Sequence, residues 1–262
     1  MRLHLSLACL VLCPLLGTAE AVPGADAVGF PHEHSDLRPD PAVRWGRLGN
    51  GLRYCLMRNQ QPREKVSLRL QVESGSLLES EAQRGLAHYL EHLAFNGTTN
   101  FPPGQLTRRL QPAGIAFGAH SNAHTSFDET VYKLDLPDPS AATVDLGLTV
   151  ITDFAGGMLI GADEVAKERG VILAEMRDRN TPAYRQRLAE FAVMFPGLRL
   201  GERFPIGIPE TIAAASPELI RAYYDAWYRP ERMILAVVGA IDLDVMAQAV
   251  ESRLGPLRSR AT

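Results

Sequence analysis

The chain has 262 residues, of which 46% are hydrophobic and 22% are charged, and its formal net charge is −3. This composition is typical of a globular protein and excludes a disordered chain, a collagen-like repeat and a disulfide-rich miniprotein. The near-neutral balance of 27 basic and 30 acidic side chains gives no reason to expect a nucleic acid as the main partner.

Residues 1–21 have the pattern of a secretory signal peptide. Arg2 supplies a positive charge, an apolar run of about a dozen residues follows it, and Ala19-Glu20-Ala21 is typical of a cleavage site. The apolar run is too short to span a bilayer, and no later stretch is long and apolar enough to do so. We therefore predict an exported protein, periplasmic or secreted, without a stable membrane anchor.

Residues 22–44 contain several prolines and glycines and little periodicity, so we expect a flexible linker and a folded domain over residues 45–262. Asn50-Gly51 separates two strand-like runs and predicts a hairpin, because both residues tolerate a positive φ. Apolar and polar residues alternate over 66–72, which predicts a half-buried strand. Cys55 is the one cysteine beyond the signal peptide, and we expect a small core residue there.

The remaining elements are a mixture of helices and strands. Periodicity and end signals predict helices over 81–95, 105–110, 140–154, 163–179, 184–194, 216–228 and 243–254. Further strands are expected over 117–125, 130–136 and 233–238. The mixture predicts an α+β fold in which a mostly antiparallel sheet packs against helices.

The strongest chemical signal is His88-Tyr89-Leu90-Glu91-His92, inside the first long helix. A helix advances about 100° per residue, so the two histidines and Glu91 share one face. Two imidazoles one turn apart can bind one Zn²⁺, and a neighbouring carboxylate can hold and deprotonate its water. This order of residues is the inverted form of the zinc-protease helix motif. The alternative is an ordinary polar, partly exposed helix face.

A catalytic zinc site usually needs a third protein ligand. Glu168 and Glu175 are seven residues apart on the helix predicted at 163–179, so they share a face. One of them could bind the metal while the other orients a histidine, and spacing alone cannot choose between them. His120 and His124 share a face of a predicted strand and could approach the metal, but surface or groove-lining roles suit them better.

Several motifs in a fixed order resemble the N-terminal domain of the M16-family zinc metallopeptidases, the group of pitrilysin, insulin-degrading enzyme and mitochondrial processing peptidase. They lie at residues 48–54, 85–98, 168–176, 205–207 and 228–230. The resemblance covers nearly all of the chain beyond the signal peptide and linker, and it is greatest to the bacterial, exported PqqL-like branch. It implies a single domain with the LuxS/M16-like metalloenzyme fold.

The resemblance also implies roles for residues that spacing left open. It implies one Zn²⁺ per chain, bound by His88, His92 and Glu175. Glu91 takes the position of the general base, and Glu168 takes that of the residue that supports a ligating histidine. The implied activity is that of a zinc endopeptidase acting on peptides or unfolded polypeptides.

The segment 121–125 resembles the edge strand with which the family binds an extended substrate, so Asn122 and Ala123 are expected to contact the substrate backbone. Members of the family use two or more homologous domains, so a homologous M16 domain or subunit is the expected partner. The alternative function is a non-catalytic subunit that binds peptides or assembles a complex. Family subunits of that kind tend to lose the zinc motif, which is intact here.

Overall fold

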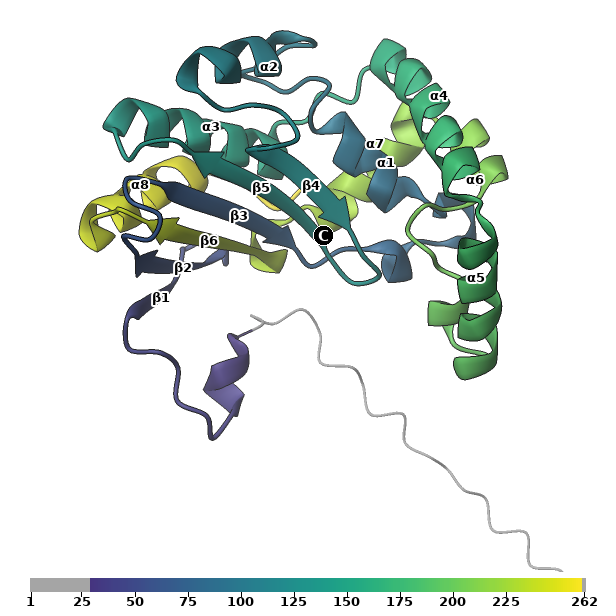
Figure 1. Ribbon diagram of the computed structural model, residues 1–262, viewed down its shortest axis with the longest axis horizontal. Helices are drawn as coiled ribbons and strands as arrows, with labels where there is room; N and C mark the ends of the chain where they lie inside the picture. The colour runs from purple at the N-terminus through teal and green to yellow at the C-terminus, as the bar shows by residue number, and fades with distance from the viewer. Residues whose placement is uncertain (1–28, 261–262) are drawn as a thin grey trace, which may run out of the picture.

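The computed structural model describes residues 29–260, so the expected signal peptide lies outside the described residues. Within them, six strands form one sheet in the order β1-β2-β6-β3-β5-β4 (Figure 1). The strands are β1 Val43–Arg47, β2 Arg53–Arg58, β3 Val66–Val72, β4 Ser121–Thr125, β5 Thr130–Leu136 and β6 Met233–Gly239. Every neighbouring pair is antiparallel except β2 and β6, which are parallel. The expected mostly antiparallel sheet is therefore confirmed.

The α-helices are α1 Leu86–Leu93, α2 Gln105–Leu110, α3 Ala141–Gly156, α4 Ala162–Arg179, α5 Pro182–Met194, α6 Pro209–Ala214, α7 Pro217–Trp227 and α8 Leu243–Leu254. α1, α3 and α8 contact the sheet, and α4 packs against α1 and α6. α4, α5 and α6 stand together at one end of the sheet (Figure 1). The α+β class is confirmed. None of the helices between residues 29 and 260 is long and apolar enough to cross a membrane.

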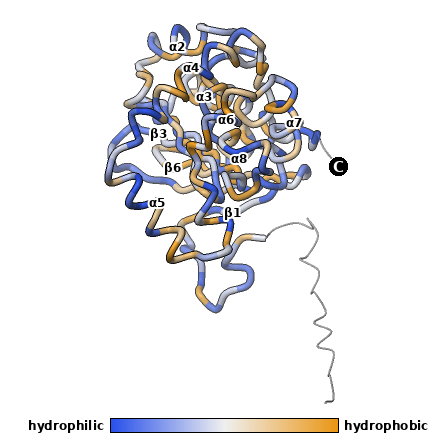
Figure 2. Tube along the Cα trace, turned by 90° about the vertical axis from the view of Figure 1, so that its right-hand side faces the viewer, coloured by the Kyte–Doolittle hydropathy of each residue, from blue (hydrophilic) through white to orange (hydrophobic). Residues whose placement is uncertain are grey.

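One face of the sheet carries the apolar core. β3, β5 and β6 each alternate buried and half-buried residues along seven positions. The buried residues of β3 are Val66, Leu68, Leu70 and Val72. Hydrophobic segments gather in the interior around α3, β6 and α8 (Figure 2). Because side chains alternate along a strand, the other face of the sheet stays partly exposed.

The hairpin predicted at Asn50-Gly51 joins β1 and β2, and Gly51 has a φ of +90°. The Oδ1 of Asn50 accepts a hydrogen bond from the Leu52 N–H at 3.1 Å, which closes the turn. The Nδ2 of Asn50 donates to the carbonyl of Leu254 at 2.7 Å. The turn residue therefore also ties the end of α8 to the hairpin.

The described part of the expected linker has structure of its own, which corrects the prediction for residues 29–44. β1 begins at Val43, and a short 3₁₀-helix spans Pro31–His34. Phe30 is only 4% exposed, because its ring packs edge-on against Trp45 with 4.9 Å between centroids. His32 also packs against Phe30 and Trp45. The Nη1 of Arg53 donates a hydrogen bond to the carbonyl of Gly29, so contacts without a periodic pattern hold this segment.

The helix that carries the His88–His92 motif begins later than predicted. α1 starts at Leu86, and the residues expected to form its first turn, Glu81–Gln83, form a separate 3₁₀ turn. Between the two, Gly85 has a φ of +95°, and a Cβ there would lie 2.9 Å from the Cα of Gly207. A distant segment thus breaks the helix, and local periodicity contains no information about such a contact.

We predict that Gly85→Ala lowers the free energy of unfolding by about 1–3 kcal/mol, because the added Cβ meets backbone atoms at a positive φ. The matched control is Gly170→Ala in α4, where an added Cβ meets nothing within 4 Å. That control should raise the free energy of unfolding by about 0.5–1 kcal/mol. Urea denaturation followed by circular dichroism measures both, and a wild-type value for Gly85→Ala would contradict the steric account.

Candidate metal centre

The core fixes the direction in which the histidines of α1 point. Leu86, Leu90 and Leu93 are at most 2% exposed and pack into the hydrophobic core. Because residues three or four apart share a helix face, burying these leucines turns the other side of α1 toward α4. His88 and His92 lie on that side, and their Nε2 atoms are 3.1 Å apart.

α4 brings one carboxylate to the two imidazoles. The Oε2 of Glu175 lies 3.6 Å from the Nε2 of His88 and 3.5 Å from the Nε2 of His92. These three atoms lie within 4.8 Å of one another, and no other group of three such ligands gathers within residues 29–260. A tetrahedral Zn²⁺ with bonds of about 2.0–2.1 Å needs ligand atoms about 3.3 Å apart, so the donor set fits zinc.

Glu168 lies behind His92 rather than beside the cluster. The residue is 7% exposed, and its Oε1 is 2.7 Å from the Nδ1 of His92. Its Oε2 accepts a hydrogen bond from the Nδ2 of Asn96 at 2.6 Å. The contact through Nδ1 leaves the Nε2 of His92 facing the other donors. The structure thus separates the two glutamates that helical spacing left equivalent.

The two imidazoles have opposite electrostatic surroundings. Burial lowers the pKa of His88 to about 3, and the nearby charges of His92 and Arg179 act in the same direction. Burial also opposes protonation of His92, but the hydrogen bond and charge of Glu168 raise the pKa of His92 above its usual value. His88 is therefore neutral at physiological pH, which is the protonation state that binds metals.

Glu91 points toward β4. Its side chain is 8% exposed, and its Oε2 accepts a hydrogen bond from the Oγ1 of Thr125 at 2.6 Å. Burial raises the pKa of Glu91, whereas the hydrogen bond from Thr125 lowers it. A general base works best when its pKa approaches the operating pH, and burial moves Glu91 in that direction.

Sequence reasoning missed two neighbours of the site. Arg179 lies one turn beyond Glu175, and its Nη2 is 2.5 Å from the Oε1 of that glutamate. The other is Asn96, one turn beyond His92, which holds Glu168. Arg179 follows Glu175 by four residues on α4, so i, i+4 spacing was the signal that could have found it. Asn96 lies beyond the end of α1 and bonds to a glutamate 72 positions away, so no local spacing pointed to it.

β4 forms one edge of the sheet, since among the described strands it pairs with β5 alone. It is shorter than the strand predicted at 117–125, because the chain turns at residues 116–120 before β4 begins. Asn122 and Ala123 both lie on this edge strand, and the Ala123 N–H donates to the Oδ1 of Asn122 at 2.8 Å. The strand ends beside Glu91, which Thr125 contacts.

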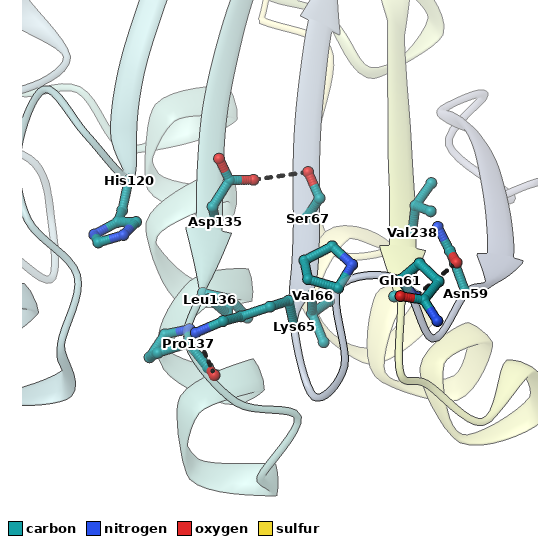
Figure 3. Close-up of a pocket in the computed structure, with 12 residues that line it drawn as sticks. Asn59, Gln61, Lys65, Val66, Ser67, His120, Asp135, Leu136, Pro137 and Val238 are labelled. Carbon is teal, nitrogen blue, oxygen red and sulfur yellow. Dashed lines mark hydrogen bonds between the residues drawn. The ribbon is translucent and has the colours of Figure 1, made fainter.

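The remaining candidates lie apart from the cluster. The Nε2 of His124 is 3.4 Å from the Oε1 of Glu129. His120 lines a separate pocket of about 400 Å³ at the ends of β3, β5 and β6 (Figure 3), and no residue of the cluster lines it. Cys55 is half-buried in β2, and burial raises the pKa of its thiol. Its nucleophilic thiolate form is therefore disfavoured.

Two family models match the chain. Residues 54–197 match the family described as insulinase (peptidase family M16), and residues 214–261 match the peptidase M16 inactive domain. The chain belongs to the M16 peptidase family. The resemblance inferred from the sequence motifs is therefore confirmed.

The relatives of this chain include bacterial zinc proteases. It is 34% identical to probable zinc protease PqqL of Haemophilus influenzae and of Escherichia coli, over 84% of this chain and 24% of each relative. The crystal structure of the first half of the periplasmic protease PqqL from Escherichia coli superposes with a TM-score of 0.83 and 32% identity, over 87% of this chain and 49% of that one. The chain spans about a quarter of the length of the full relatives.

We predict that Glu168→Gln destabilises the metal-free chain mainly in mildly acidic solution. Burial opposes the charge of Glu168, but the hydrogen bond and charge of His92 lower the pKa of Glu168 below its usual 4.5. The pKa of His92 is raised above 6.5. The stabilisation of the fold by the His92–Glu168 ion pair is therefore complete between about pH 4.5 and 6.5. It is lost as the pH rises through the folded-state pKa of His92.

Urea unfolding in the presence of a chelator measures this effect as a function of pH. At pH 5–6, Glu168→Gln should lower the free energy of unfolding by about 1–3 kcal/mol, the range for a partly buried hydrogen bond between charged groups. Glu164→Gln is the matched control, because Glu164 lies on the same helix and pairs with Lys167 instead. A loss that is constant across the pH range would show that the His92–Glu168 ion pair is not its origin.

Proposed function

We propose that this chain provides the zinc-binding domain of an endopeptidase that hydrolyses extended peptides or unfolded polypeptides. The supporting observation is the convergence of His88, His92 and Glu175 within 4.8 Å, with Glu91 on the same helix as the two histidines. The family and its zinc-protease relatives point to the same reaction class.

His88, His92 and Glu175 would hold one Zn²⁺, which when bound polarises a carbonyl group and lowers the pKa of a water molecule. Glu91 accepts the proton of the attacking water and then delivers it to the leaving amine nitrogen. Thr125 holds one oxygen of the Glu91 carboxylate in place during both transfers.

The edge of β4 is the proposed binding surface for the substrate backbone. An extended peptide adds to a free sheet edge through main-chain hydrogen bonds, and this mode tolerates many side-chain sequences. Because Asn122 covers the Ala123 N–H, its side chain must turn away before a peptide can pair there. The end of β4 at Thr125 then brings the peptide to Glu91.

A second homologous M16 domain is the proposed partner. The relatives are about four times as long as the matched region, and the solved half of PqqL is about twice as long. Stabilising the charge that develops in peptide hydrolysis requires preorganised donors in a site shielded from water, which one open domain does not provide. Export to the periplasm is proposed from the expected signal peptide and from the periplasmic PqqL of Escherichia coli.

We predict one zinc ion per chain in the purified protein, measured by elemental analysis. Glu175→Gln should weaken zinc binding by more than about 100-fold, because an amide oxygen is a weaker ligand than a carboxylate and even supporting residues are worth 10–100-fold. Glu164→Gln in the same helix is the control and should keep the full zinc content. Equal zinc content in both variants would remove Glu175 from the site.

We predict that Glu91→Gln keeps zinc but reduces peptide cleavage by about 10²–10⁴-fold, since the amide cannot accept a proton. Cleavage is measured for the chain alone and with a homologous M16 domain added, with Glu190→Gln on the surface of α5 as the control. Wild-type turnover in Glu91→Gln would exclude the mechanism. A zinc-loaded wild type that binds peptides but cleaves none in either assembly would favour the non-catalytic subunit.

A further inference from the structure

Glu79 is a buried carboxylate for which the proposed mechanism has no use. Its side chain is 1% exposed, and it lies just before the start of α1. Its Oε2 accepts a hydrogen bond from the N–H of Gly85 at 2.8 Å, and its Oε1 accepts one from the N–H of Ala87 at 2.9 Å. Both oxygens are therefore bound to backbone amides of the first turn of α1.

α1 has no side chain of its own that could cap this turn. The first N–H groups of a helix have no partner within the helix, and an N-cap side chain usually satisfies one of them. The N-cap residue here is Gly85, and its contact with Gly207 leaves no room for a Cβ. The acceptors must come from elsewhere in the chain, and Glu79 supplies two.

The segment that carries Glu79 is held in turn by the loop before α6. The carbonyl of Glu79 accepts a hydrogen bond from the Nη2 of Arg199, and the carbonyl of Arg203 accepts one from the Oγ of Ser76. These contacts join chain segments more than 100 positions apart. Glu79 is therefore anchored to the rest of the domain independently of α1, so it can fix the position of the first turn of α1.

His88 depends on this helix end more than His92 does. Glu168 orients the ring of His92 through its Nδ1. The Nδ1 of His88 has no hydrogen-bond partner in the part of the chain that the structure describes, although the residue is 6% exposed. Since no hydrogen bond at Nδ1 orients this ring within the described residues, the place of His88 depends on its packing and on the backbone of α1. The residue before it is Ala87, whose N–H donates a hydrogen bond to Glu79.

We propose that Glu79 is a positioning residue of the metal centre. It accepts hydrogen bonds from the N–H groups of Gly85 and Ala87, which fixes the first turn of α1 and thereby the place of His88. The inference rests on the proposed function, since it concerns the same metal centre. It assigns to Glu79 the support for His88 that Glu168 provides for His92.

Cobalt binding tests this assignment, because the visible absorption of Co²⁺ reports the arrangement of its ligands without an activity assay. Glu79→Gln keeps one acceptor but turns an NH₂ group toward a backbone N–H. It should change the Co²⁺ spectrum and weaken Co²⁺ binding by about 10–100-fold, as for other residues that orient a ligand. Glu190→Gln, an exposed carboxylate of α5 that accepts a hydrogen bond from Gln186, should match the wild type in both respects.

Glu79→Asp keeps both oxygens on a shorter side chain, so it changes their reach without replacing either one by an NH₂ group. Its Co²⁺ affinity should lie between those of the wild type and Glu79→Gln. A folded Glu79→Gln with the wild-type spectrum and affinity would overturn the inference while leaving the proposed function intact. A wild-type chain that binds no Co²⁺ would overturn the proposed function and this inference together.

Amide hydrogen exchange in the metal-free wild type covers the case in which Glu79→Gln does not fold. The N–H groups of Gly85 and Ala87 should be protected as strongly as that of Tyr89, which bonds to the carbonyl of Gly85 within the same turn. Rapid exchange of Gly85 and Ala87 beside a protected Tyr89 would show that Glu79 does not hold this turn, and the inference would fall.

Discussion

The rotation of α1 about its own axis is the constraint on which the candidate site depends. Leu86, Leu90 and Leu93 are buried in the core, and this burial leaves no freedom for the helix to turn. The free energy of burying three leucines, about 1.5–3 kcal/mol each, far exceeds any preference of a single histidine for solvent. The core of the domain therefore decides where His88 and His92 point.

The second constraint is the contact between α1 and α4. The hydroxyl of Tyr89, a fully buried residue, donates to the carbonyl of Val165 in the first turn of α4. This contact joins α1 to the first turn of α4 and helps to fix the offset of α4 along the axis of α1. The offset decides which residue of α4 lies level with the imidazoles. Glu175 is at that level, whereas Glu168, two turns nearer the start of α4, lies behind His92.

Local patterns predicted the elements that local forces determine. The strand at 66–72 and the helices at 105–110 and 243–254 coincide with β3, α2 and α8, because alternation, caps and periodicity lie within those segments. The start of α1 was predicted too early, since it depends on the approach of Gly207 from a distant loop. The six-residue helix α6 was not predicted, although α2 has the same length and was.

The same division holds for the site. The spacing of His88, Glu91 and His92 is a property of one helix, so their shared face was predictable. Whether Glu168 or Glu175 joins them depends on the offset between α1 and α4. Spacing along one helix cannot reveal this offset, so the choice of Glu175 came from the family resemblance. His92 and Glu175 are 83 positions apart, with β4, β5 and α3 between them. Closing so long a loop costs entropy before any ligand meets another, so a metal held there would act as a late cross-link of an already folded domain and not as a nucleus for its folding.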